Sequence, residues 1–213
     1  RSTPLYSSAA SDVYKRQGQL MVNPTLPAPP ARPRTLMVGV TLATGAVVMF
    51  FGGLFAVYFS MRADAMAGGS EWYPEGAIQL SPGGMNMATL TVATVSMAWA
   101  TYSVARNDRI HTYLALALTA VMGIAMINQT VFYLNDIALP VDYSISTTLL
   151  FTIVGAHMVM VGVGVLWLGV LLLRAFGGQD TSRHRDLVSA AALYWYASVA
   201  VYSVIWIGIY IGK

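Results

Sequence analysis

The sequence lacks cysteine and is poor in charge. Its 213 residues contain no cysteine, which excludes disulfides, iron–sulfur clusters and thiolate metal sites. Charged residues make up only 10% of the chain and hydrophobic residues 56%, whereas a soluble domain has about 25% charged residues. So few charges cannot cover a water-facing surface, and the composition therefore predicts a polytopic membrane protein. The basic residues are spread over several loops, which gives no indication of nucleic-acid binding.

Metal ligands and buried carboxylates are also scarce. The three histidines are His111, His157 and His184. His157 is predicted to lie near the middle of an apolar segment, whereas His111 and His184 are predicted to lie at the inner surface of the membrane. The three therefore cannot converge on one metal ion. All nine carboxylates lie outside the apolar segments, although proton relays and ion pumps usually place such groups within the membrane. We expect no metal, no cofactor and no catalytic residue in this chain, and leave open whether it belongs to an enzyme.

The amino-terminal region differs from the rest. Residues 1–20 are polar and lack the apolar segment that a signal peptide contains. We therefore interpret them as non-native and expect the natural chain to begin near Met21. Residues 21–34 include "NPTLPAPPARPR", which predicts an extended, proline-rich cytoplasmic tail.

Long apolar segments dominate what remains. Each is near or above the roughly 20 residues that cross about 30 Å of hydrocarbon as a helix, and only helices and closed barrels satisfy the backbone there. The sequence thus predicts an all-α bundle of five transmembrane helices within residues 35–213. The expected spans are 35–61, 86–105, 111–134, 145–173 and 187–211.

The basic residues predict the orientation, because cytoplasmic loops are enriched in Lys and Arg. Seven would lie on one side of the membrane and two on the other, which places the amino terminus inside and the carboxyl terminus outside. The seven are Arg32, Arg34, Arg106, Arg109, Arg174, Arg183 and Arg185, and the two are Arg62 and Lys213.

A few polar side chains fall inside the predicted spans. His157 should be neutral and hydrogen-bonded, because a buried charge costs several kcal/mol. Its possible partners are Thr44, a tyrosine, a backbone carbonyl or water. We favour a structural role for this histidine over the alternative, a remnant of a functional pair. Asn128 and Gln129 are expected to connect helices by hydrogen bonds rather than to serve transport.

Small residues recur in the first and fourth spans and permit close helix contact. We expect them to pack the bundle, and a docking face for another subunit is the alternative. They are Gly45, Gly52, Gly53, Gly155, Gly162 and Gly164.

From about Leu36 onward, four motifs in order resemble subunit III of the haem–copper oxidases, the cytochrome c oxidase group. "MFFGGLFAVYF" is similar to the family's E-V-M-F-F-x-G-L-F-x-x-Y-F helix, and "EWYPEG" to its external W-P-P-x-G loop. "FTIVGAHMVMV" resembles F-x-x-x-G-x-H-x-x-H-V, and "ALYWYASVAVYSVIW" resembles A-x-Y-W-H-F-V-D-V-V-W. The resemblance implies a short, five-helix form of this subunit.

Several polar positions of the family are apolar or altered here. Val47 stands at the position of the family's intramembrane glutamate, and Met160 at that of the second histidine. In the last motif Tyr194 is kept, while Tyr196 and Val199 replace a histidine and an aspartate. His157 therefore resembles the surviving member of a polar cluster.

The resemblance also implies a function. Subunit III of this family is a metal-free accessory subunit that packs against subunit I, holds phospholipid and helps to sustain proton uptake, while subunits I and II carry haem and copper. We expect such a subunit in a bacterial plasma membrane. The alternatives are a subunit III-like partner of a quinol oxidase or nitric oxide reductase, or a small membrane transporter.

Overall fold

The structure is a computed structural model that describes residues 35–137, 139–176 and 182–212. The expected segments 1–20 and 21–34 lie outside the described residues. The described chain contains helices and no strand, which confirms the all-α prediction. The helices are α2 (Thr35–Ala67), α3 (Leu80–Ala105), α4 (Arg109–Asp136), α5 (Ile145–Phe176) and α6 (Ser182–Ile205), and α6 continues into a π-helical turn, η1 (Trp206–Ile211).

The helices extend beyond the apolar segments that predicted them. α2 continues past residue 61 to Ala67 and takes in Arg62 and Asp64, and α3 begins at Leu80 rather than at residue 86. The apolar segment reflects the thickness of the hydrocarbon, whereas a helix continues into the polar interface as long as its backbone stays hydrogen-bonded. Hydropathy therefore predicted where the helices lie but not where they end.

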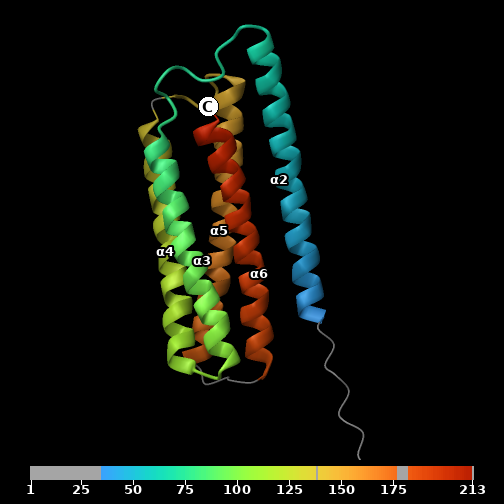
Figure 1. Ribbon diagram of the computed structural model, residues 1–213, viewed down its shortest axis with the longest axis vertical. Helices are drawn as coiled ribbons and strands as arrows, with labels where there is room; N and C mark the ends of the chain where they lie inside the picture. Colours follow the sequence, from blue (N-terminus) through green and yellow to red (C-terminus); the bar gives the residue numbers. More distant parts are fainter. Residues whose placement is uncertain (1–34, 138, 177–181, 213) are drawn as a thin grey trace, which may run out of the picture. The chain divides into compact units, whose positions relative to one another are not determined.

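Successive helices run in opposite directions, as Figure 1 shows. α3 packs along α4 and α6, α5 packs along α4 and α6, and α2 packs mainly along α6 with a smaller contact to α5. Because five helices alternate in direction, α2 begins at the end of the bundle opposite to the end where η1 stops (Figure 1).

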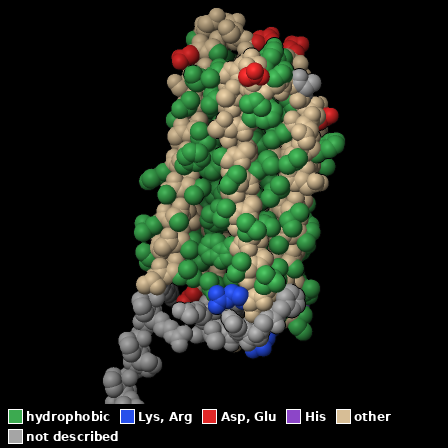
Figure 2. Space-filling model, turned by 180° about the vertical axis from the view of Figure 1, so that it is seen from behind, with side chains coloured by type: hydrophobic (Ala, Val, Ile, Leu, Met, Phe, Trp, Pro, Cys, Tyr) green, Lys and Arg blue, Asp and Glu red, His purple; other side chains and the backbone are tan. Residues whose placement is uncertain are grey.

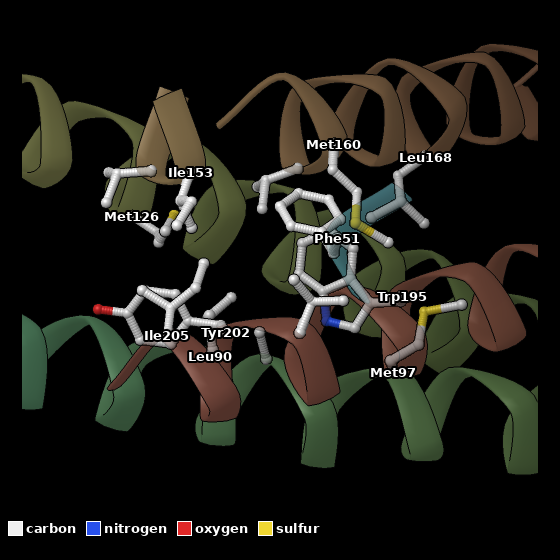
Figure 3. Packing of buried hydrophobic residues seen from close by; sticks show 14 of the residues in the cluster. Phe51, Leu90, Met97, Met126, Ile153, Met160, Leu168, Trp195, Tyr202 and Ile205 are labelled. Atoms are coloured by element: carbon white, nitrogen blue, oxygen red, sulfur yellow. The ribbon is translucent and has the colours of Figure 1, made fainter. Parts of the chain in front are cut away.

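All five helices contribute side chains to one apolar core (Figure 3). Phe51 comes from α2, Met97 from α3, Met126 from α4, Met160 from α5 and Trp195 from α6, and each is at most 3% exposed. α2 contributes least, because only three of its 33 residues are buried. These three are Thr44, Phe51 and Tyr58, spaced seven residues apart on one face of the helix.

Close helix contacts occur at glycines other than those expected. A Cβ atom at Gly123 would lie 2.5 Å from Val165 and 2.8 Å from Trp195, so a side chain larger than hydrogen does not fit there. Among the six glycines named from the sequence, only Gly164 lies at a close helix contact. A Cβ atom built there would lie 3.3 Å from the ring of Trp195. A Cβ atom at any of the other five would meet nothing within 4 Å, so the expectation that these five allow close helix contact is wrong in the described chain.

Four of the five helices are long and apolar enough to cross a membrane: α2, α4, α5 and α6 with η1. α3 has sufficient length, 26 residues, but it is less apolar, since it carries Ser, Thr and Asn side chains along much of its length. It packs between α4 and α6, which allows several of these polar groups to be buried. The structure supports a membrane protein with several spanning helices, and a membrane crossing by α3 stays a prediction.

Charges separate to the two ends of the bundle (Figure 2). We call one end the acidic end: its described charged side chains are Arg62, Asp64, Glu71, Glu75, Asp136 and Asp142. The opposite, basic end has Arg106, Asp108, Arg109, Arg174, Arg185 and Asp186.

Candidate functional site

His157 lies inside the bundle at the place where α2, α5 and α6 meet. Its side chain is 1% exposed. The Nε2 atom lies 3.0 Å from the backbone carbonyl oxygen of Ser198 on α6 and 3.3 Å from the hydroxyl of the same residue. The ring also packs beside Tyr202 of α6 and Phe51 of α2, with ring centroids 5.2 Å and 6.3 Å away. The histidine thus joins three helices.

The geometry decides which ring nitrogen carries the proton. A carbonyl oxygen can only accept a hydrogen bond, so Nε2 must be the N–H donor toward Ser198. In the neutral ring Nδ1 is then an acceptor, and it is buried without a partner among the described residues. No acidic or basic side chain of the described chain is buried beside it. His157 can therefore connect helices, but it has no neighbouring carboxylate with which to exchange a proton.

The α2 positions on the face that carries Phe51, the neighbour of His157, are apolar or weakly polar. Val47 is half-buried and packs against the core, on the same face of α2 as Thr44 and Phe51. Thr44 is 6% exposed, and its hydroxyl has no partner among the described residues. Of the four partners considered for His157, a backbone carbonyl is present, that of Ser198, and the Thr44 hydroxyl makes no hydrogen bond to His157 in the described chain.

The other predicted polar residues have different environments. The Tyr194 hydroxyl donates to the carbonyl oxygen of Met160 at 3.0 Å, which connects α6 to α5. Tyr196 is 37% exposed at the surface of the bundle. Asn128 is exposed and Gln129 is half-buried, so their expected role in joining helices stays a prediction.

Three cross-helix hydrogen bonds involve residues that sequence reasoning missed. The Asn86 amide donates to the Thr130 hydroxyl at 3.0 Å and joins α3 to α4. The Tyr202 hydroxyl donates to the carbonyl oxygen of Gly83 at 3.0 Å. The Ser96 hydroxyl donates to the carbonyl of Ala115 at 2.9 Å. Asn86 lies at the edge of an apolar segment, and this position was the available signal for it.

The remaining histidines belong to the basic end. His111 is exposed, and its Nδ1 lies 2.7 Å from a carboxylate oxygen of Asp108. Asp108 is the N-cap of α4, and the hydrogen bond from the His111 backbone N–H lowers the pKa of that carboxyl group. The side chain of His184 lies outside the described residues. The described residues hold no group of three or more His, Cys, Asp or Glu side chains that could bind a metal ion.

Known proteins resemble this chain over most of its length. The family described as Cytochrome c oxidase subunit III matches residues 30–212. The protein named Cytochrome c oxidase subunit 3 from Oryctolagus cuniculus is 30% identical over 181 residues, which cover 82% of this chain and 69% of that protein. The proteins of the same name from Petromyzon marinus and Pelomedusa subrufa are each 30% identical, over 179 and 185 residues. These alignments cover 82% and 85% of this chain, and 69% and 71% of the relatives.

Proposed function

Because this chain belongs to the cytochrome c oxidase subunit III family, we propose that it is an accessory subunit of an aerobic respiratory terminal oxidase. In this role it stabilises the catalytic subunit I, binds membrane phospholipid and supports proton uptake. Haem and copper belong to the partner subunits I and II. The family match carries the proposal, because it spans residues 30–212 and so includes all five helices.

The buried polar groups support an accessory role. The buried polar residues of the described chain are Ser, Thr and Asn, which carry neutral hydroxyl or amide groups, and the single histidine His157. Pathways for protons usually contain carboxylates or chains of ionisable groups, and Val47 and Met160 are apolar where the family has polar residues. We assign the main proton pathway and the redox chemistry to the partner subunits. In this proposal the chain supports proton uptake by stabilising subunit I, and His157 is a structural residue.

The surface of α2 supports contact with a neighbour. Three of its 33 residues are buried, and Gly45, Gly52 and Gly53 face open space. Small residues allow another helix to approach closely. We propose that this surface contacts phospholipid and a partner subunit of the oxidase.

Charge supports the proposed orientation. The acidic end has one described basic side chain, Arg62, and the basic end has four: Arg106, Arg109, Arg174 and Arg185. By the positive-inside rule the basic end faces the cytoplasm, which puts the amino terminus inside and the carboxyl terminus outside. We propose the plasma membrane of a bacterium as the location, since the resemblance is to the short, five-helix form of the subunit.

The experiment that tests this function is purification of the tagged chain from its native membrane in mild detergent. We expect haem-bearing subunit I and a copper-bearing subunit II to copurify in equal amounts with the chain. Reproducible recovery of the chain alone would contradict the proposal. A copurifying catalytic subunit that oxidises quinol or reduces nitric oxide would keep the accessory role but change the complex.

A further inference from the structure

An open pocket of about 350 Å³ lies at the acidic end, where the loop of residues 68–79 meets the end of α4. Glu75 and Asp136 line it and are exposed. Tyr133 of α4 also lines it, although this side chain is only 4% exposed. The Gln79 backbone N–H lies near the phenol oxygen and can only donate to it, so the hydroxyl proton has no acceptor among the described residues. The pocket therefore borders a buried donor that lacks a partner.

Asn86 supplies an acceptor deeper in the bundle. It is 1% exposed, and its Oδ1 atom has no donor among the described residues. The Thr130 hydroxyl, which accepts from the Asn86 amide, donates instead to the carbonyl oxygen of Met126 at 2.8 Å. The Tyr202 hydroxyl also lies beside this amide, but it donates to the carbonyl oxygen of Gly83 at 3.0 Å. A buried amide oxygen without a donor is costly, which indicates that a group from outside the described chain donates to it.

Direct contacts connect Tyr133 to Asn86. Tyr133 lies one helical turn after Thr130 on α4, and Thr130 binds the Asn86 amide. The ring of Tyr133 also packs beside that of Tyr210, with the centroids 5.9 Å apart. A Cβ atom at Gly83 would lie 2.5 Å from the Tyr210 ring, so this ring lies directly on the α3 backbone one turn before Asn86. The donor at the pocket and the acceptor on α3 thus belong to one buried cluster.

His157 adds an acceptor at the inner end of this cluster. Because its Nε2 atom donates to Ser198, its Nδ1 atom is an acceptor, and Nδ1 has no donor among the described residues. The ring lies beside Tyr202, with the centroids 5.2 Å apart. Tyr202 in turn binds Gly83, one turn before Asn86. The contacts therefore continue from Asn86 to the middle of the bundle.

The unpaired atoms decide the chemical class of the ligand. The Tyr133 hydroxyl needs an acceptor, whereas Asn86 and His157 need donors. A metal ion cannot accept from a hydroxyl, and a simple anion cannot donate to an amide oxygen. A water molecule does both, and buried waters make about three hydrogen bonds each to such groups. No Asp, Glu, Lys or Arg side chain of the described chain is buried, so the cluster suits neutral molecules.

We propose that a file of internal water molecules leads from the pocket at the acidic end to His157. The outermost water accepts from the Tyr133 hydroxyl, an inner water donates to Oδ1 of Asn86, and the innermost donates to Nδ1 of His157. The file opens at the acidic end and stops at this histidine, so it hydrates the middle of the bundle without crossing it. This inference concerns the bundle itself and goes beyond the proposed function.

The test is X-ray radiolysis of the tagged full chain, with whatever subunits copurify, because bound water then yields hydroxyl radicals that oxidise adjacent side chains. Met126 is the reporter, since its sulfur lies 3.8 Å from the Thr130 hydroxyl that binds Asn86. Met97 is the internal reference: both methionines are 0% exposed and belong to the same apolar core, but Met97 lies toward the basic end of α3 (Figure 3). Mass spectrometry measures the oxidation of each methionine, and we expect Met126 to be oxidised several times faster than Met97.

Two variants remove the proposed partners of the water. Asn86→Leu keeps the approximate size of the side chain but removes the amide, so it should lower the oxidation rate of Met126 to that of Met97. Tyr133→Phe removes only the outer hydroxyl, so it should lower the oxidation rate of Met126 by a smaller factor. Ser96→Ala is the matched control, because the Ser96 hydroxyl already donates to the carbonyl oxygen of Ala115 at 2.9 Å. It should leave the oxidation of Met126 unchanged.

Equal oxidation rates of Met126 and Met97 in the wild type would overturn the proposal. An unchanged oxidation rate of Met126 in Asn86→Leu would overturn it as well. If Asn86→Leu does not fold, Tyr133→Phe decides in its place, and an unchanged rate there overturns the proposal. These results do not depend on which subunits copurify, so they are separable from failure of the proposed function.

Discussion

Helices α2 and α6 show how differently two apolar helices can be used in one bundle. α2 has the higher mean hydropathy of the two but only three buried residues among 33. α6 is less apolar, yet it has buried residues at nearly every turn, including Val188, Trp195 and Tyr202. In a membrane the most apolar surface faces lipid, whereas polar groups are hidden inside where they find partners. In α2, high hydropathy accompanies exposure at the surface of the bundle rather than burial in its core.

The largest expected effect contrasts a glycine of the bundle with one of α2. Gly123→Ala should destabilise the protein by roughly 1–3 kcal/mol, because the new methyl group would overlap Val165 and Trp195 and overpacking has costs of this size. Gly52→Ala is the control, and it should stay within about 0.5 kcal/mol of the wild type because nothing lies within 4 Å of the new atom. Thermal unfolding of the purified protein measures both. Equal losses would show that α2 is packed as tightly as the bundle.

The next effect tests the junction of α2, α5 and α6 at His157. His157→Ala should lower stability by roughly 1–3 kcal/mol, because it removes a buried hydrogen bond to Ser198 and leaves a cavity. Turnover of the freshly assembled oxidase should stay nearly intact. Ser198→Ala keeps the backbone acceptor, so its cost should be about 1 kcal/mol or less. Prompt and complete loss of turnover in His157→Ala would refute the structural role.

A smaller effect is expected when the buried amide of Asn86 is compared with the exposed amide of Asn128. Asn86→Ala breaks the bond between α3 and α4 and should cost about 0.6 kcal/mol, with about 1.7 kcal/mol as the upper range for such bonds in membranes. Asn128→Ala should leave thermal stability unchanged, since Asn128 is exposed on α4. A greater loss for Asn128→Ala than for Asn86→Ala would mean that the rotation of α4 differs from the one described.

The smallest effect concerns the cap of α4 at the basic end. Because the folded pKa of Asp108 is lowered, its charge stabilises the fold above its ordinary pKa of about 3.9, and this contribution is lost as pH falls through the lower, folded value. Asp108→Asn keeps a capping side chain without the charge. At pH 7 the variant should unfold at a slightly lower temperature than the wild type, and this difference in unfolding temperature should vanish in strong acid. A difference that grows as the pH falls would contradict this assignment.

The sequence could predict the helices because a bilayer leaves few choices for the backbone. It could not predict which polar residues of α4 face inward. Thr119, Met126, Thr130 and Tyr133 form the buried face, and Asn128, two residues from both Met126 and Thr130, falls on the opposite side of the helix. α4 carries apolar residues on every face, so hydropathy does not predict which face of this helix is buried.

The candidate site was predictable in part for a related reason. His157 stands out as an ionisable ring in an apolar segment, and its burial follows from the cost of exposing it to lipid. Its acceptor is a backbone carbonyl, which every residue of α6 possesses, so no side-chain pattern indicates Ser198. Gly123 was missed likewise, because the large residue that requires it, Trp195, is distant in sequence.

The most direct test of the account is the haem and copper content of this chain after it is separated from its copurified partners. If the chain is an accessory subunit, all haem absorbance and copper should remain with the partner subunits, and the separated chain should hold none. Stoichiometric haem or copper that stays with the separated chain would contradict the account.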